Sequence, residues 1–325
     1  MYERYYGLRE RPFNLTSNPR YLLLTPTHTE GLSALQCGIS SRRGIIVLVG
    51  ESGTGKTTVI RAAVASQTDA CFVLINNPLL TRSEFLQHLA EGFGLSDQAA
   101  TSKPRFLSEL TRMLETNLRN GGQAALIVDE AHVLPDEILE EIRLLANIET
   151  DEYKLLPVVL AGQPELADRL NSPTLRQLKQ RVALRCSLGA LQIKETAAYI
   201  AGRIRVAGGN PVTLFTPEAV ELVHQCSKGL PRTISVICDN ALVTGFAADE
   251  RPVGRNTVLE VCRDLDIEVP EPEPVRPLVD ARSPDTNQAN NGQTAALSQT
   301  VVESEPQQPP AKSMALGRSF RRLFF

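Results

Sequence analysis

The feature that most constrains the fold of this chain is the segment Gly50-Glu51-Ser52-Gly53-Thr54-Gly55-Lys56-Thr57, which directly follows the apolar run 45–49. It matches the pattern G-x-x-x-x-G-K-[ST], which joins a strand to a helix and holds the phosphates of a nucleotide. Glycines let backbone N–H groups curl around an anion where a Cβ would obstruct them. An accidental glycine-rich turn is the alternative, but the strand-like and helical flanks disfavour it. We therefore predict that this loop, together with Thr58, holds the phosphates of a nucleotide.

Two side chains at the end of the loop have specific expected roles. Lys56 supplies a point charge to the β and γ phosphates of the nucleotide. Thr57 offers a hydroxyl oxygen to Mg²⁺, and the helix that begins here points its positive end at the anion. The motif therefore predicts a bound nucleotide with Mg²⁺, and the family resemblance described below implies that the nucleotide is ATP.

A second apolar run, 125–128, ends in the acids Asp129 and Glu130. Asp129 would stand at the carboxyl end of a strand, where it can hold Mg²⁺ directly or through water. Glu130 is then the expected base that orients the attacking water. The alternative is an acidic turn that caps the next helix. The letters Asp-Glu-Ala-His also match a helicase signature, but the chain is too short for two helicase cores, so we expect His132 at a helix N-terminus.

The order of apolar patterns predicts an α/β domain over residues 1–188. Continuous apolar runs are typical of strands buried on both faces of a parallel sheet. Segments whose apolar residues recur every three or four positions alternate with them, which indicates a doubly wound sheet with helices on both faces. The predicted strands are 45–49, 71–75, 124–128 and 157–161, and the predicted helices between them include 83–93, 104–119 and 135–146.

Beyond residue 188 the composition predicts a small all-α domain over residues 189–268 and a tail over residues 269–325. The expected helices are 193–207, 217–227, 231–247 and 255–265. The tail is rich in Pro, Gln and Ser, which predicts disorder because such a segment cannot bury enough apolar surface. Its end, 318–325, mixes Arg with Phe. This end is either a sticky terminus without a role or a docking peptide for a partner or an anionic membrane surface.

Composition narrows the class of protein. The formal net charge is −3 and the pI is about 5.9, so the chain lacks the basic footprint of a dedicated nucleic-acid binder. Six scattered cysteines without a C-x-x-C pair indicate buried free thiols in a reducing compartment. No secretory signal and no apolar run of membrane-spanning length is present in the sequence. We expect a cytoplasmic protein, peripheral at the inner membrane if the tail docks there.

The combination of loop, Asp-Glu strand, later strand with a polar end and helical lid resembles an AAA+ ATPase. The opening segment 5–21, with its Tyr-Gly-Leu and Pro-Phe series, is similar to one family in particular, the general secretion pathway protein A type. His28, Gly162-Gln163-Pro164-Glu165-Leu166, 178–181 and Gly229-Leu230-Pro231-Arg232 support the likeness. The resemblance covers residues 1 to roughly 268.

The resemblance implies roles for further residues. Gln163 looks like the sensor-1 residue that orients water, although a polar residue in a β-to-α turn is the plainer alternative. Arg181 resembles the arginine finger that reaches the nucleotide of the neighbouring subunit, with Arg176 and Arg185 as competitors. Arg232 looks like sensor 2, on the lid. The alternative is an ordinary solvated arginine. This alternative has weak local support, because a cation at a helix start is disfavoured by the helix dipole.

Asn76, at the end of the second predicted strand, is a further candidate that would hold Glu130 inactive until a partner engages.

Together these features predict an ATP hydrolase that forms a homo-oligomer and serves a protein partner in a bacterial envelope export system. Many members of the family continue into a membrane span and a peptidoglycan-binding region, for which this sequence shows no segment. We therefore do not expect this chain itself to open the cell wall. The alternatives are a DNA-dependent ATPase that resembles transposition target-selection proteins, which the charge balance disfavours, and a nucleotide-gated adaptor, against which the intact Asp129-Glu130 pair argues.

Overall fold

The computed structural model describes residues 1–16, 18–67, 70–76 and 79–269. These residues all belong to one compact unit. The tail predicted to be disordered lies, from residue 270 onward, outside the described residues, and so does the Arg- and Phe-containing end at 318–325.

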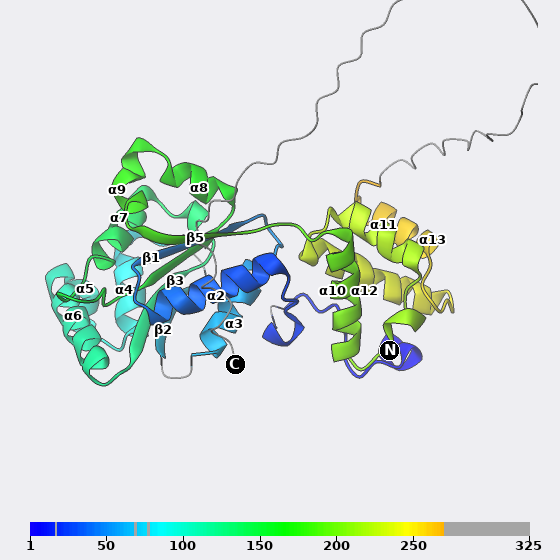
Figure 1. Cartoon of the computed structure of the whole chain (residues 1–325), viewed down its shortest axis with the longest axis horizontal. Helices are drawn as coiled ribbons and strands as arrows, with labels where there is room; N and C mark the ends of the chain where they lie inside the picture. The colour runs from blue at the N-terminus through cyan, green and yellow to red at the C-terminus, as the bar shows by residue number, and fades with distance from the viewer. Residues whose placement is uncertain (17, 68–69, 77–78, 270–325) are drawn as a thin grey trace, which may run out of the picture. The chain divides into compact units, whose positions relative to one another are not determined.

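A parallel sheet occupies the first half of the chain (Figure 1). Within the described residues it has five strands in the order β2-β3-β4-β1-β5, and every neighbouring pair is parallel. The strands are β1 (Ile45–Gly50), β2 (Ala70–Ile75), β3 (Gln123–Val128), β4 (Val158–Gly162) and β5 (Val182–Leu188). Four of them lie on the four predicted apolar runs, because a strand buried on both faces is apolar at every position.

The fifth strand, β5, was not among the predicted strands. It lies at the edge of the sheet, where Arg185 and Ser187 are exposed while Cys186 and Leu188 are buried. An edge strand of this kind alternates between polar and apolar residues, so it lacks the continuous apolar run that marks the other four.

Helices cover both faces of the sheet. Alternate residues of β1 point to opposite faces, so Ile46 and Leu48 join one buried cluster and Ile45, Val47 and Val49 join another. Helices α2 and α3 pack in the first cluster, and α4–α9 in the second. These helices are α2 (Pro26–Ser40), α3 (Lys56–Ala65), α4 (Arg82–Gly92), α5 (Asp97–Thr101), α6 (Lys103–Arg119), α7 (Asp136–Leu145), α8 (Pro164–Leu170) and α9 (Arg176–Lys179), with 3₁₀ turns η1 (Pro19–Tyr21), η2 (Ala131–Val133) and η3 (Pro173–Leu175).

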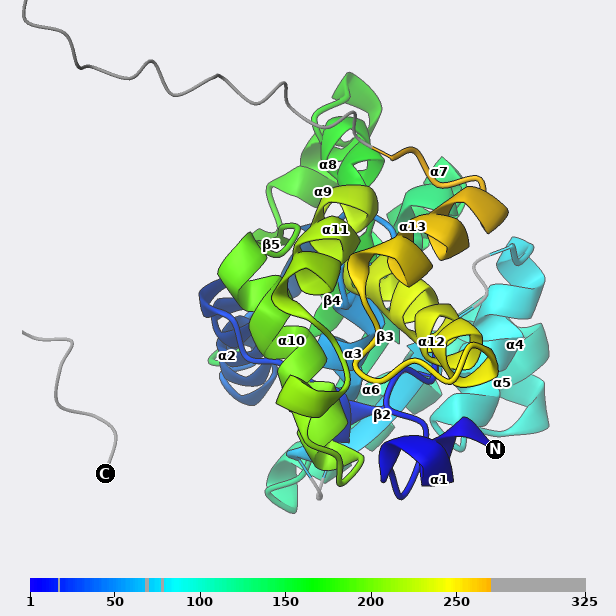
Figure 2. The ribbon, with the colours of Figure 1, turned by 90° about the vertical axis from the view of Figure 1, so that its right-hand side faces the viewer.

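The chain after β5 forms a helical domain (Figure 2). Its elements are α10 (Ile193–Val206), η4 (Pro211–Thr213), α11 (Pro217–Ser227), α12 (Pro231–Ala247) and α13 (Arg255–Asp264). All four predicted helices lie within one residue of these bounds. Local capping explains the agreement: the Thr216 side chain accepts a hydrogen bond from the Ala219 N–H at the start of α11, and Gly229 adopts the left-handed conformation (φ 73°) just after its end.

The first residues of the chain pack into this helical domain. Helix α1 (Tyr2–Tyr6) contacts α12, and Tyr2, Tyr6 and Phe13 are buried in the same cluster as the residues of α10–α13. The Tyr2 hydroxyl donates a hydrogen bond to the Asp239 carboxylate. The first residues, which the predicted α/β domain of residues 1–188 includes, therefore contribute to the core of the helical domain. The domain limits at residues 188 and 268 stay a prediction.

Candidate functional site

The predicted phosphate loop connects β1 to α3, as the motif requires. Gly53 and Gly55 have φ angles of 83° and 102°, a region that L side chains rarely adopt. A Cβ on Gly50 would lie 2.7 Å from the Leu188 carbonyl oxygen, so the turn out of β1 also needs glycine. The last two residues of the loop, Lys56 and Thr57, begin α3, where unpaired helix N–H groups and the positive end of the helix dipole favour an anion.

Lys56 is folded back into this loop. Its side chain is buried, and its Nζ donates hydrogen bonds to the Gly50 carbonyl oxygen (2.8 Å) and the Glu51 carbonyl oxygen (3.1 Å). Burial lowers the pKa of Lys56, while the nearby carboxylates of Glu130 and Asp129 act in the opposite direction. An anion in the loop would offer this ammonium group a stronger partner than the two carbonyls.

The two predicted metal ligands meet at the carboxyl ends of their strands. The Thr57 hydroxyl donates a hydrogen bond of 2.6 Å to Asp129 Oδ2. Asp129 follows β3 and is buried, and its backbone N–H bonds to the Ile75 carbonyl oxygen of β2. A carboxylate and a hydroxyl oxygen beside a phosphate loop are the donor set that Mg²⁺ takes. The residues therefore fit that ion.

Glu130 lines a cavity of about 240 Å³ beside the loop, together with Lys56 and Thr57. Its backbone is left-handed (φ 55°), which is uncommon for a residue other than glycine. Its carboxylate oxygen Oε2 lies 3.4 Å from Nδ1 of His132. On the far side of that ring, His132 Nε2 lies 3.1 Å from the side-chain nitrogen of Gln163. The structure thus places His132 between Glu130 and Gln163. His132 lies in the 3₁₀ turn η2, before the first residue of α7, and its side chain is largely buried.

Arg232 lies on the other wall of the same cavity. It is the second residue of α12, and its backbone N–H donates to the Gly53 carbonyl oxygen (3.2 Å). A Cβ on Gly53 would lie 2.8 Å from the Arg232 Cβ, so the loop and the helical domain are in close contact here. Among the described residues, the Arg232 guanidinium has no hydrogen-bonded partner, and its side chain is exposed. It is therefore free to meet an anion held by the loop.

Arg181 lies at the end of the sheet where the strands begin, opposite the end that carries the phosphate loop. Its carbonyl oxygen accepts a hydrogen bond from the backbone N–H of Ile45 at the start of β1 (3.3 Å), whereas the phosphate loop follows the end of that strand. Six strand residues correspond to about 20 Å. Arg181 cannot reach the loop of its own chain, and it is exposed, as are its competitors Arg176 and Arg185.

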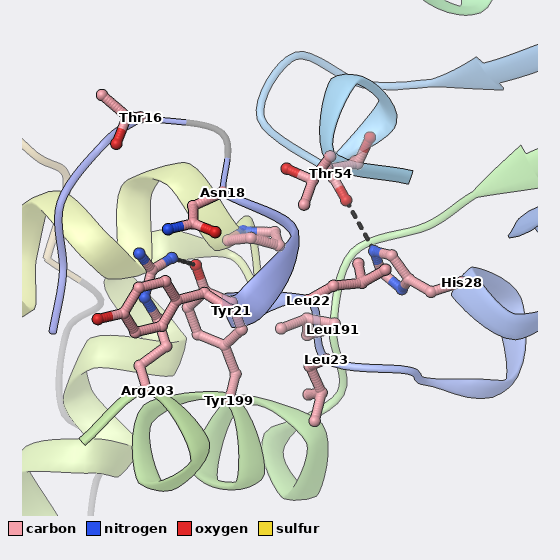
Figure 3. A pocket seen from close by; sticks show the side chains of 13 residues that line it. Thr16, Asn18, Tyr21, Leu22, Leu23, His28, Thr54, Leu191, Tyr199 and Arg203 are labelled. Carbon is pink, nitrogen blue, oxygen red and sulfur yellow. Dashed lines mark hydrogen bonds between the residues drawn. The ribbon is translucent and has the colours of Figure 1, made fainter. Parts of the chain in front are cut away.

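A second cavity adjoins the loop, and the sequence analysis did not identify it (Figure 3). Apolar and aromatic residues dominate its walls: Tyr21, Leu22, Leu23, Leu191, Tyr199 and Pro231 line it beside Thr54, Gly55 and Thr58. These walls suit the flat face of a nucleotide base. The pair Tyr199 and Arg203, one helical turn apart on α10, was the available signal, but i,i+4 pairs are common on any helix.

Arg203 connects the start of the chain to this cavity. It is buried, and its Nε and Nη2 donate to the carbonyl oxygens of Pro12 (2.6 Å) and Asn14 (2.8 Å). Its guanidinium carbon lies 4.7 Å from the centre of the Tyr21 ring and 5.3 Å from that of Tyr199. These contacts hold residues 12–14 against α10, and Asn14 also lines the cavity beside the phosphate loop.

His28, in α2, is hydrogen-bonded to the backbone of the phosphate loop. Its buried ring donates a hydrogen bond from Nε2 to the Thr54 carbonyl oxygen (3.0 Å), which is drawn in Figure 3. The Thr25 hydroxyl lies 2.6 Å from Nδ1 and fixes the ring from the other side. The His28 ring also favours glycine at position 55, since a Cβ there would lie 3.2 Å from the His28 Nε2. His28 thereby ties the start of α2 to the loop.

Known proteins share the sequence pattern and the fold of this chain. Residues 39–170 match the family model of an AAA domain. General secretion pathway protein A of Aeromonas hydrophila is 43% identical over 254 residues, which cover 76% of this chain and 45% of that protein. This chain thus matches less than half the length of that relative. The resemblance predicted from the opening segment is confirmed.

More distant relatives are transposition proteins. The Mu-like prophage FluMu DNA transposition protein B of Haemophilus influenzae is 30% identical over 47% of this chain and 52% of that protein. The ATP-dependent target DNA activator B of Escherichia phage Mu is 25% identical over 82% of this chain and 79% of its own length.

Solved structures share the fold. The ORC2 protein of Aeropyrum pernix superposes with a TM-score of 0.60 at 16% identity, over 79% of this chain and 72% of that one. Cdc6p of Pyrobaculum aerophilum gives a TM-score of 0.58 at 16% identity, over 75% and 68% of the two chains. The predicted fold class, a parallel AAA+ sheet followed by a helical domain, is confirmed.

Replacement of His28 by Leu should destabilise the loop, because the buried Thr54 carbonyl oxygen loses its donor. We expect a loss of about 1–3 kcal/mol in the free energy of unfolding and weaker nucleotide binding, measured by denaturation and by titration with a fluorescent ATP analogue. The variant His28→Gln, whose amide nitrogen can replace Nε2, should recover most of both quantities. A Leu variant as stable as the wild type would show that the bond does not support the loop.

Proposed function

Because residues 39–170 form an AAA domain and most of the chain is related to general secretion pathway protein A, we propose that this protein is a Mg²⁺-dependent ATP hydrolase that assembles or regulates a bacterial envelope export system. The observation that carries the hydrolase proposal is that Lys56, Thr57 and Glu130 line one cavity and that the Thr57 hydroxyl is bonded to Asp129. These residues follow β1 and β3, which are not neighbours in the sheet, and each has a task in phosphoryl transfer.

The phosphates bind in the loop 50–58, where backbone N–H groups and Lys56 neutralise their charge. Thr57 and Asp129 hold Mg²⁺, which when bound adds a positive charge beside the phosphates. Glu130 faces the cavity and orients the attacking water, whose proton its carboxylate can accept. Gln163 acts next to Glu130 as the second polar group at the strand ends. Arg232 approaches the phosphates from the helical domain, so closure of this domain would complete the site.

Hydrolysis also needs an arginine from a neighbouring subunit. Arg181 is exposed about 20 Å from its own loop, so it can act only in trans, and the functional form would be a homo-oligomer. A cation supplied in this way neutralises charge that develops in the transition state.

The export role rests on the relative's name and remains separate from the chemistry. General secretion pathway protein A is more than twice as long as the matched region, so its partners transfer to this chain only as a proposal. No helix among residues 1–16, 18–67, 70–76 and 79–269 has the length and apolarity to cross a bilayer. We propose that the protein works in the cytoplasm at the inner face of the membrane, where the end of the tail would dock.

A DNA-dependent ATPase is the second candidate. It is favoured by the similarity to the target DNA activator of phage Mu, which extends over 82% of this chain. Against it stands the formal net charge of −3.

Replacement of Lys56 by Ala should abolish ATP binding or turnover, because the phosphates lose the ammonium group in the loop. Replacement of Glu130 by Gln should leave binding intact but lower the rate of hydrolysis by about 10²- to 10⁴-fold, so that ATP is trapped. Equilibrium binding and phosphate release measure the two quantities separately. Normal hydrolysis by either variant would contradict the assignment of the site.

Mixing variants tests the arginine in trans. Arg181→Ala protein retains its loop, and Lys56→Ala protein retains its Arg181, so a mixture should recover hydrolysis that neither has alone. The rate per subunit should also rise with the concentration of wild-type protein. Arg176→Ala and Arg185→Ala serve as matched controls. Wild-type turnover by the Arg181→Ala protein would exclude Arg181, and recovery only by one of the controls would transfer the role to that residue.

The two candidate functions differ in their response to duplex DNA. The export proposal expects an ATPase rate that is independent of added DNA at low and high salt. A DNA-dependent ATPase would be stimulated by DNA, with an affinity that falls steeply as the salt concentration rises. Measuring the rate across both variables decides between them.

A further inference from the structure

His132 occupies a position between the two polar groups that are expected to handle water. Its side chain is 13% exposed, against 42% for the side chain of Glu130. Nδ1 faces the Glu130 carboxylate at 3.4 Å, and Nε2 faces the Gln163 amide at 3.1 Å. Both ring nitrogens are thus used within the site. A residue that merely began a helix would not need either contact.

The backbone around His132 is held in place. Arg169 of α8 donates a hydrogen bond of 2.6 Å to the His132 carbonyl oxygen and forms an ion pair with Asp136. Helix α8 begins directly after Gln163. Helix α8 therefore holds the backbone of His132 through Arg169, and it directly follows Gln163, whose side chain contacts the His132 ring.

The protonation of the ring determines which contacts are made. A neutral imidazole has one N–H donor and one acceptor nitrogen. With the proton on Nδ1, this N–H faces the Glu130 carboxylate oxygen 3.4 Å away, and Nε2 accepts from the Gln163 side-chain amide. With the proton on Nε2, Nδ1 instead accepts the hydrogen bond of 3.5 Å from the Gln163 backbone N–H, and no N–H faces Glu130. The position of the Gln163 amide thereby selects whether Glu130 is held.

We propose that His132 is a positioning residue that transmits the orientation of Gln163 to the Glu130 carboxylate. This inference rests on the proposed ATP hydrolysis and deepens it. Glu130 lines the cavity while it faces His132, so the contact holds the carboxylate toward the nucleotide. Asn76, which the sequence analysis expected to hold Glu130 inactive, forms no hydrogen bond with Glu130 among the described residues.

Three substitutions separate the two contacts. His132→Leu removes both contacts of the ring, to Glu130 and to Gln163. In His132→Asn the amide nitrogen replaces Nδ1 and keeps the donor to Glu130, and in His132→Gln it replaces Nε2 and keeps the contact with Gln163. Because the carboxylate does the chemistry, we expect the Asn variant to retain more activity than the Gln or Leu variants.

The expected result for His132→Leu is a loss in kcat of about 10- to 100-fold. The affinity for ATP, measured in a binding assay without turnover, should stay within about threefold of the wild-type value, since Lys56 and Thr57 remain. His132→Gln should lose nearly as much in kcat as His132→Leu. The control is His88→Leu, which replaces an exposed histidine of α4 that does not line the cavity and should change neither quantity.

A double-mutant cycle tests the transmission itself. If Gln163 acts through His132, then Gln163→Ala should reduce kcat less in the His132→Leu background than in the wild type. Thermal melting of each variant shows whether it is folded.

The proposal is overturned if His132→Leu hydrolyses ATP at the wild-type rate or faster, or if the two losses simply multiply. It is also overturned if His132→Asn is no better than His132→Leu. A wild-type protein that binds ATP but does not hydrolyse it would contradict the proposed function itself, which distinguishes the two failures.

Discussion

The hydrogen bond between the Thr57 hydroxyl and the Asp129 carboxylate is the contact on which the candidate site depends. It joins the helix after β1 to the end of β3, although β4 lies between these strands in the sheet. Because all strands are parallel, the phosphate loop, the acid pair and Gln163 reach the same edge from three successive strands. In the order β3-β4-β1, Gln163 follows the strand between those that carry the phosphate loop and Asp129-Glu130. His132 lies in contact with both Gln163 and Glu130.

The start of the chain contacts both sides of the nucleotide site. Residues 2–14 pack with the helical domain, where Arg203 binds the carbonyl oxygens of Pro12 and Asn14. Residues 25–40 pack with the sheet, and His28 bonds to the phosphate loop. The helical domain is thus joined to the α/β domain by two chain crossings, at residues 15–24 and 189–192. A motion of this domain would move the walls of the site and the segment before α2 together, so nucleotide binding and domain closure should be coupled.

Local sequence patterns predicted most strands and helices, whereas the roles of several site residues came only from family resemblance. Continuous apolar runs located β1 to β4, and caps such as Thr216 located the lid helices to within a residue, because both signals are local. The edge strand β5 alternates exposed and buried residues, so it lacked the continuous apolar run that located the other strands. The roles expected of Lys56, Thr57 and Asp129 came from one motif and one strand end. Those of Arg181 and Arg232 came from family resemblance, and they stay proposals.

The sequence by itself determined that a phosphate loop follows a buried strand, that two acids end another, and that a helical domain comes next. These conclusions need only spacing, polarity and backbone freedom, which are properties of neighbouring residues. Only the tertiary structure decided that His132 bridges Glu130 and Gln163, that His28 supports the loop and that Arg203 holds the start of the chain. Each of these contacts joins residues distant in sequence through the strand order, and a side chain's partner across that distance depends on packing that no local pattern records.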